Sequence, residues 1–335
     1  MTEKILIIQT AFPGDVILTL PVLQVLKREF PDYKIDFICI PKTAELLEGN
    51  PLINNLIIYD KRKSGINGFM DLIRKVRNSK YDIIISPHRS FRSTLISYLS
   101  GSKKTVSFDS SAFSSLYNVK VKYQKDIHEI QRNLSLLKPL GINEMNLIRP
   151  ELFISAESKD KVTKYLIEKK IRSENKFICI APGSVWFTKR YPKQKFVKLC
   201  DMLSGRDMKI FLTGGNADKD ISEFILKNTI NNNVIDATGE FKFKESAELI
   251  RRSELLITND SAPLHLANAA GTKVFALFGA TIPAFGFYPI GREDLVFETN
   301  GLKCRPCSIH GGNECPVKTF ECMERINAEA IVNSI

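Results

Sequence analysis

The chain has 335 residues, which is long enough for two domains that each have a core. Its 44% hydrophobic and 25% charged residues are ordinary for a globular protein, and no apolar run approaches the roughly 20 residues that cross a bilayer. The net charge of +11 is compatible with an anionic partner or with a merely solvated basic surface. No helix-turn-helix, zinc-finger or RNP motif is present, which argues against nucleic acid. The apolar run at residues 5–8 is too short for a secretory signal, so we expect a cytoplasmic protein.

Apolar runs and helical patterns alternate through the first half of the chain. We expect strands at 4–10, 34–40, 55–59, 81–86 and 103–108. We expect helices at 16–30, 42–48, 69–78, 92–100 and 127–140, the first of them regular only from about Thr19 because of Pro21. This alternation predicts a doubly wound, mostly parallel α/β sheet.

Residues 142–155 read as a connection, and a second alternating series follows it. We expect strands at 177–181, 209–213, 233–236, 255–258 and 274–278. The helical patterns are at 157–170, 194–203, 219–229, 243–252, 263–270 and 323–335. The sequence therefore predicts a domain over 1–155, a second over 156–320, and a helical tail over 321–335.

Polar residues cluster where the strand at 255–258 ends and the next helix begins. Ser261 is placed to cap that helix, and Pro263 suits its first turn. The free N–H groups and the dipole of a helix start favour an anion, and ligands of open α/β sheets bind beyond the carboxyl ends of strands. Asp260 would accept from hydroxyls and His265 would donate to a phosphate. The alternative is a simple cap with a satisfied surface histidine.

Asp15 follows Gly14 directly after the first predicted strand. A carboxylate just past a strand end lies where ligands of open α/β sheets bind, and it could act there as a general base. A cap for the first helix is the structural alternative, and both roles are compatible.

Two motifs at opposite ends of the chain resemble one family. The pattern D-S-x-P-x-H-L-A-x-A-x-G-x-x-V-x-A-L-F-G starts at Asp260 and is followed by T-x-P at Thr281, and G-D-x-x-x-T-x-P starts at Gly14. Together they resemble the signatures of the lipopolysaccharide heptosyltransferases, glycosyltransferase family 9, of the heptosyltransferase II-like kind. The resemblance implies a GT-B fold, in which two Rossmann-like domains face each other across a cleft and the tail often crosses back onto the first domain.

The resemblance also implies an activity. It is the inverting transfer of heptose from ADP-heptose to the inner core of lipopolysaccharide, with Asp15 as the base and no required metal, because Lys189 and a helix N-terminus replace a divalent cation. The implied donor-binding residues are Ser184, Thr188, Lys189, Gly214, Gly215, Asp218, Asp260, Ser261, Ala262 and His265. The chain departs from the family at Tyr191, where Trp is frequent, and at Asp218, where Glu is frequent and Asp220 competes for the role.

On the acceptor side, Arg89 and Arg92 follow the fourth strand in a segment that resembles the family. Guanidinium groups bind carboxylate and phosphate bidentately, so these two would hold the anionic lipid A–core glycolipid. We therefore expect a peripheral protein at the cytoplasmic face of the inner membrane. Exposed cations at a helix start are the alternative for both arginines, and helix capping is the alternative for His128, which also matches a family pattern.

Four of the seven cysteines lie close together in the sequence, at Cys304, Cys307, Cys315 and Cys322. That spacing is compatible with a tetrahedral zinc site, but reduced thiols in a packed loop are the favoured interpretation. Two other functions stay open: a GT-B transferase with another nucleotide sugar, and a non-catalytic nucleotide-sugar-binding protein. A Rossmann-type redox enzyme is disfavoured, because the loop after the first strand lacks G-x-G-x-x-G.

Overall fold

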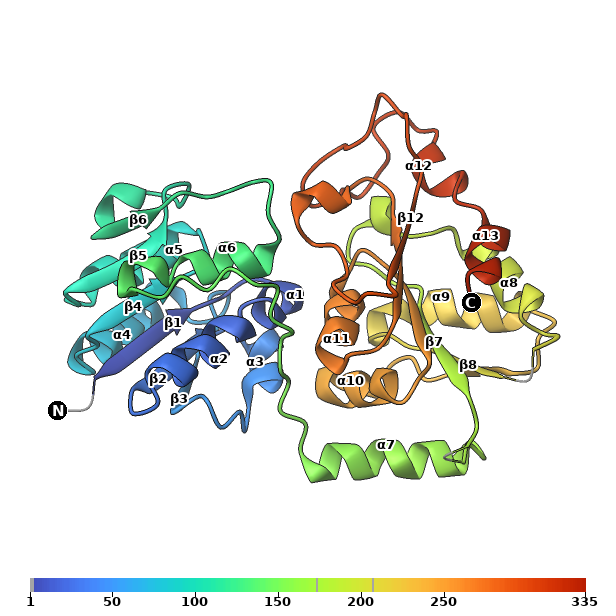
Figure 1. The fold of residues 1–335 in the computed structure, drawn as a ribbon, viewed down its shortest axis with the longest axis horizontal. Coiled ribbons are helices and arrows are strands. Elements are labelled where there is room, and N and C mark those ends of the chain that lie inside the picture. Colours follow the sequence, from blue (N-terminus) through green and yellow to red (C-terminus); the bar gives the residue numbers. More distant parts are fainter. Residues whose placement is uncertain (1–2, 173, 207) are drawn as a thin grey trace. The chain divides into compact units, whose positions relative to one another are not determined.

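The computed structural model describes residues 3–172, 174–206 and 208–335. The chain forms two compact units, Met1–Phe153 and Ile154–Ile335. Figure 1 shows a central sheet with helices on its faces in each unit. Within the described ranges, no helix combines the length and the apolarity that a bilayer crossing requires.

The first unit is built on a six-stranded sheet in the order β3-β2-β1-β4-β5-β6, and every neighbouring pair is parallel. Its strands are β1 (Lys4–Ile8), β2 (Lys34–Cys39), β3 (Asn55–Ile58), β4 (Ile83–Ser86), β5 (Lys104–Phe108) and β6 (Val119–Val121). The central strands β1 and β4 are buried, which explains why KILII and IIIS are apolar without alternation.

The helices of the first unit agree with the predicted pattern apart from the first and the last, since the helix expected at 127–140 ends at Ser135 and a separate 3₁₀ turn follows at Lys138–Leu140. They are α1 (Pro13–Ile17), α2 (Leu20–Glu29), α3 (Pro41–Leu47), α4 (Gly65–Asn78), α5 (Phe91–Leu99) and α6 (Glu129–Ser135). The segment predicted as one helix from residue 16 is divided: a short α1 precedes α2, whose N-cap is Thr19. Pro21 falls in the first turn of α2, where its missing N–H leaves no bond unmade.

The second unit repeats the same architecture, with the order β12-β11-β10-β7-β8-β9 and parallel pairs throughout. Its strands are β7 (Phe177–Ala181), β8 (Lys209–Leu212), β9 (Val234–Asp236), β10 (Leu255–Asn259), β11 (Val274–Phe278) and β12 (Leu295–Glu298). Helices α7 (Ala156–Glu168), α10 (Phe243–Arg251) and α11 (Ala262–Ala270) pack together, and α8 (Lys193–Met202) packs with α9 (Lys219–Asn228).

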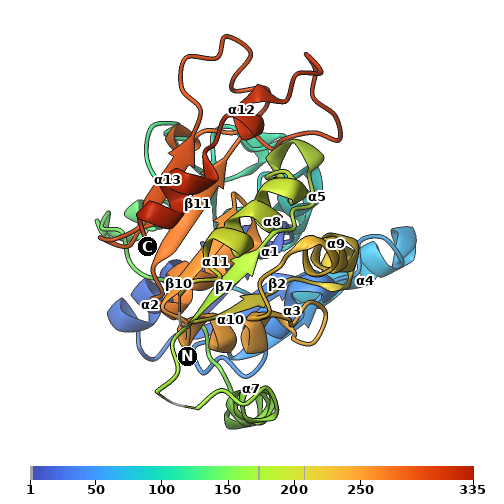
Figure 2. The same cartoon turned by 90° about the vertical axis from the view of Figure 1, so that its right-hand side faces the viewer.

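The tail differs from the expected single helix, because it forms two short ones, α12 (Glu321–Glu324) and α13 (Ala328–Asn333). Figure 2 shows α13 beside α8, and Met323 and Ile331 are buried in the core of the second unit. The hydroxyl of Tyr191 donates to the carbonyl of Ile326 (3.0 Å). The expected return of the tail to the first domain stays a prediction.

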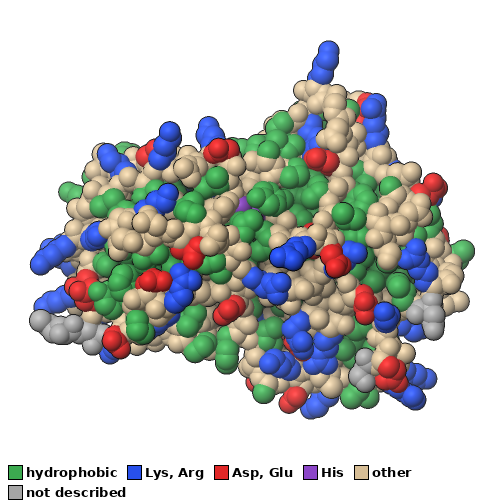
Figure 3. Space-filling model, in the orientation of Figure 1, with side chains coloured by type: hydrophobic (Ala, Val, Ile, Leu, Met, Phe, Trp, Pro, Cys, Tyr) green, Lys and Arg blue, Asp and Glu red, His purple; other side chains and the backbone are tan. Residues whose placement is uncertain are grey.

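Figure 3 shows the lysine and arginine side chains on one face of the molecule. They are spread over that face and do not form one dense tract, which agrees with the diffuse excess of positive charge in the sequence.

Candidate active site

The strand order of each sheet reverses its direction at one point, between β1 and β4 in the first unit and between β7 and β10 in the second. Ligands of doubly wound sheets bind beyond the carboxyl ends of the strands at such a point. The loops that follow these four strands carry most of the polar residues singled out from the sequence.

Lys189 and Asp260 form an ion pair at the switch point of the second unit. Lys189 Nζ lies 2.6 Å from Asp260 Oδ2, and the two side chains are only 14% and 7% exposed. The hydroxyl of Thr281 donates to the same carboxylate oxygen at 2.6 Å. Lys189 is therefore no ordinary loop cation, and Thr281, which the sequence motif contained without a role, belongs to the cluster.

Asn259 connects the two loops that carry this pair, although no sequence motif predicted a role for it. Its amide donates to the carbonyl of Pro182 (2.8 Å), and its Oδ1 accepts from the backbone N–H of Tyr191 (2.9 Å). Tyr191 is buried and its ring meets Phe196 edge-on at 5.2 Å. The tyrosine in place of the family's tryptophan is thus well packed.

Ser184 and Thr188 lie in the loop after β7 and are both buried. The carbonyl of Ser184 accepts from Arg190 Nε (2.7 Å), which shapes the loop. Thr188 Oγ1 accepts from the backbone N–H of Gly312 (2.8 Å). The Thr188 hydroxyl is therefore already engaged with a distant loop.

The helix after β10 begins at Ala262, with Ser261 at the N-cap position as predicted. The Ser261 side chain does not cap it: Oγ lies 3.4 Å from the carbonyl of Asn259 and 3.5 Å from that of Gly183. The interpretation of a capping bond is therefore wrong. The helix has nine residues, enough to direct a positive dipole end toward the Lys189–Asp260 pair.

His265 lies one turn into this helix and is buried, not at the surface as the alternative interpretation expected. Burial lowers the pKa of its imidazole to about 4, against an opposing effect of Asp260. Its Nδ1 is buried without a hydrogen-bond partner among the residues the structure describes. His265 is therefore neutral near pH 7, when one ring nitrogen alone carries a proton.

The Asp218 carboxylate packs against the backbone of glycines that follow β7 and β8. Its Oδ2 accepts from the backbone N–H of Gly215 (2.9 Å). A Cβ added to Gly183 would lie 2.0 Å from Asp218 Oδ1, and one added to Gly214 would lie 2.8 Å from Oδ2. The glycines thus give this carboxylate its place, whereas Asp220 lies exposed in the first turn of α9.

Asp15 lies at the third position of α1 in the first unit. Its carboxylate accepts from the backbone N–H of Phe12 (3.2 Å), so it stabilises the helix start without being the N-cap itself. Asp15 also interacts electrostatically with the buried Glu129. Burial raises the pKa of Glu129 to about 7, an effect that Arg132 opposes and Asp15 strengthens.

Arg89 lies over the ring of Tyr123, with 4.1 Å from its guanidinium carbon to the ring centroid, and Arg132 lies 5.1 Å from the same centroid. Arg92 is exposed near Lys61, whose pKa is lowered by burial first and by Arg92 second. In the described ranges, neither Arg89 nor Arg92 has a carboxylate at salt-bridge distance. Both arginines therefore remain available to an anion.

His88 was part of the predicted segment but had no assigned role. Its Nδ1 lies 2.8 Å from Thr10 Oγ1, which joins the loops after β4 and β1. Burial first, and Lys61 second, lower the pKa of His88 to about 4. His128 has the structural role considered for it, since it is the N-cap of α6 and its Nδ1 accepts from the backbone N–H of Ile130 (3.2 Å).

The four carboxy-terminal cysteines are free thiols. No group of three or more His, Cys, Asp or Glu side chains is arranged for a metal within the described ranges. Cys322 lies in the core of the second unit, where burial raises the pKa of its thiol to about 11, and the nearby Cys307, Cys315 and Cys304 raise it as well. The four thiols therefore lie near one another, and the choice between reduced thiols and a zinc site stays a prediction.

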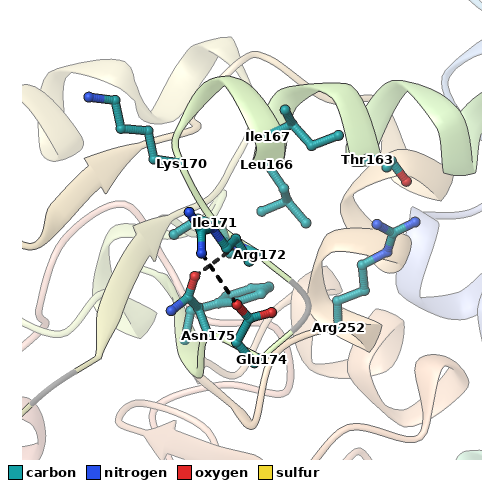
Figure 4. A pocket seen from close by; sticks show the side chains of 10 residues that line it. Thr163, Leu166, Ile167, Lys170, Ile171, Arg172, Glu174, Asn175 and Arg252 are labelled. Atoms are coloured by element: carbon teal, nitrogen blue, oxygen red, sulfur yellow. Dashed lines mark hydrogen bonds and ion pairs between the residues drawn. The ribbon is translucent and has the colours of Figure 1, made fainter.

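A surface pocket lies at the opposite end of β7, among Leu166, Ile171, Phe177 and Arg252. Figure 4 shows Leu166, Ile171 and Arg252 around the ion pair of Arg172 and Glu174 (3.9 Å). The pocket is at the amino-terminal end of the strand, away from the switch point, and we assign it no function.

Comparison with known proteins gives consistent matches. The family model "Glycosyltransferase family 9 (heptosyltransferase)" matches residues 69–316, which leaves Asp15 outside the matched segment. Lipopolysaccharide heptosyltransferase 3 of Escherichia coli K12 is 29% identical over 284 residues, 82% of each chain.

Two solved structures share the fold. A glycosyl transferase family 9 protein of Veillonella parvula has a TM-score of 0.88 and 24% identity, covering 99% of this chain and 96% of its own. The ADP-heptose lipopolysaccharide heptosyltransferase II of E. coli has a TM-score of 0.81 and 22% identity, covering 99% and 97%. The two units are thus the Rossmann-like domains of the GT-B class, as predicted.

Proposed function

Because this chain belongs to glycosyltransferase family 9, we propose that it transfers heptose from ADP-heptose to the inner core of lipopolysaccharide with inversion at the anomeric carbon. Relatives that bear the name of a lipopolysaccharide heptosyltransferase support the acceptor class, and one that is named for ADP-heptose supports the donor. The charged side chains at the switch point of the second unit, Lys189 and Asp260, support the proposed transfer chemistry.

The second unit would hold the donor. In the reaction the acceptor oxygen bonds to C1 of the heptose while the bond from C1 to the diphosphate oxygen breaks, and ADP leaves. Negative charge therefore grows on the diphosphate, and Lys189 with the N-terminus of α11 would stabilise it. Asp260 would orient Lys189 and accept from sugar hydroxyls, and Asp218 would accept from the ribose.

The first unit would supply the base. Asp15 would take the proton of the acceptor hydroxyl as the new bond forms, a contribution of about 10²–10⁴ in rate. Attack on the face of C1 opposite to the diphosphate inverts the anomeric configuration. Arg89 and Arg92, without carboxylate partners in the described chain, would bind anionic groups of the lipid A–core acceptor at the cytoplasmic face of the inner membrane.

The observation that carries the proposal is the Lys189–Asp260–Thr281 cluster, located where doubly wound sheets bind ligands. The test is a panel of ADP-, GDP- and UDP-sugars with a heptose-deficient core acceptor, followed by NMR assignment of the product anomer. We expect product with ADP-heptose and an inverted anomer. Product only with another nucleotide sugar, a retained anomer, or donor binding without any transfer would each overturn the proposal.

A further inference from the structure

We propose that Arg305 is a positioning residue for the donor site and acts through the turn after β11. This inference rests on the proposed function, because that function assigns Lys189 and Asp260 to the donor. Arg305 lies in the long segment between β12 and α12, and its side chain is only 5% exposed.

The guanidinium of Arg305 donates hydrogen bonds to the backbone of the turn at residues 279–281. Nε donates to the carbonyl of Gly279 (2.6 Å), and Nη2 donates to the carbonyl of Thr281 (2.8 Å). The backbone N–H of Cys307 donates to the carbonyl between them, that of Ala280 (3.0 Å). Residues 305–307 therefore hold three successive carbonyls of the turn.

Further donors of Arg305 are paired as well. Nη2 lies 2.5 Å from the carboxylate of Glu298, and Nη1 donates to the carbonyl of Thr299 (3.0 Å). A nearly buried guanidinium is tolerated only when its N–H groups are paired, and its planar fork reaches several carbonyls at once. A lysine cannot reproduce that pattern, because its three donors radiate from a single atom.

The turn at residues 279–281 contacts the residues of the proposed donor site. The hydroxyl of Thr281 donates to Asp260 Oδ2, the same oxygen that Lys189 Nζ contacts, both at 2.6 Å. The backbone N–H of Ala280 points to the carbonyl of Thr188 at 3.4 Å. A shift of the turn would therefore move the Thr281 hydroxyl, which is a hydrogen-bond donor to Asp260. It would also loosen the loop that carries Lys189.

The same segment also holds that loop directly. Gly312 accepts from the backbone N–H of Thr188 (3.0 Å) and donates to Thr188 Oγ1 (2.8 Å). At Gly311, whose φ is +88°, an added Cβ would lie 3.1 Å from Lys189 Cγ. Residues 305–312 therefore contact both loops of the Lys189–Asp260 pair, and Arg305 is the side chain that fixes one end of the contact.

The test compares Arg305→Met and Arg305→Lys with the wild type by amide hydrogen exchange and by titration with ADP. We expect faster exchange at residues 279–281 and at Thr188, and ADP affinity about tenfold to a hundredfold lower. The matched control is Arg252→Met: Arg252 donates to Glu248 (2.7 Å) on α10, and Glu248 keeps a second partner in Arg251. That variant should leave exchange in the turn and ADP affinity unchanged.

A second variant separates positioning from general destabilisation. In a Thr281→Val background, Arg305→Lys should weaken ADP binding by a smaller factor than in the wild type, because the route through the Thr281 hydroxyl is already lost and only the contact of Ala280 with Thr188 remains. Wild-type exchange and wild-type ADP affinity in folded Arg305→Lys would overturn the inference, and so would an undiminished effect in the Thr281→Val background. A wild-type protein that binds no ADP would instead refute the proposed donor, and hydrogen exchange would still decide the role of Arg305.

Discussion

The Lys189–Asp260 pair leads to different expectations for stability and for activity. At 2.6 Å and an effective dielectric constant of 20, the attraction is about 6 kcal/mol before desolvation is subtracted. Removal of one member leaves a buried charge and costs about 3–5 kcal/mol. Because Lys189 keeps 14% of its side chain exposed, we expect Lys189→Met to lower the free energy of unfolding by about 3 kcal/mol.

The double variant Lys189→Met/Asp260→Asn removes both charges, so it should unfold within about 1 kcal/mol of the wild type. Its transfer rate should stay at least about a hundredfold low, because nothing then compensates the charge on the leaving diphosphate. The test is a double-mutant cycle. Denaturant unfolding and initial rates are measured for the wild type, the two single variants and the double variant. A cost below about 0.5 kcal/mol for Lys189→Met would refute the ionic pair, and recovered activity in the double variant would refute the role of Lys189.

Three further outcomes follow from the geometry. Asp15→Asn should reduce turnover by about 10²–10⁴ with donor affinity unchanged, as measured by initial rates and ADP titration; equal turnover would discard Asp15 as the base. Gly183→Ala should weaken ADP binding about tenfold by displacing Asp218, whereas Gly205→Ala, with open space around it, should not; similar affinities would show that Asp218 adapts. His265 has a native pKa of about 4, below its ordinary value of 6.5, so the unfolded chain binds the extra proton. The contribution of His265 to the free energy of unfolding is complete above pH 6.5 and falls by about 2 kcal/mol at pH 5. The denaturant midpoint of His265→Asn should therefore vary less between these pH values than that of the wild type.

The strands with the strongest apolar patterns were predictable almost to the residue, as β7 (Phe177–Ala181) and β11 (Val274–Phe278) show. Both are buried on both faces, so their sequences are continuously apolar. The predictions missed β6 (Val119–Val121) and β12 (Leu295–Glu298), which are short edge strands with partly exposed side chains. A strand that buries little apolar surface leaves little signal in its sequence.

The candidate site was predictable where a motif is local. Asp260 and Lys189 were singled out separately, but their ion pair depends on two strands that become neighbours only in the sheet. Asn259 and Arg305 were missed for the same reason, since each contacts backbone carbonyls that are remote in sequence. The buried position of His265 was missed because a polar residue in a helix start reads as exposed.

The charges of the two units have different consequences for catalysis. Lys189 is already compensated by Asp260. In the proposed reaction it would therefore attract a ground-state diphosphate weakly and would gain most when charge develops on the leaving group. Arg89 and Arg92 have no carboxylate at salt-bridge distance in the described chain, so they would bind acceptor anions equally before and during the reaction. Substitution of Lys189 should therefore act mainly on kcat, and substitution of either arginine mainly on the KM for the acceptor. Steady-state kinetics with both substrates varied would contradict this division if Arg89→Gln lowered kcat while its acceptor KM stayed at the wild-type value.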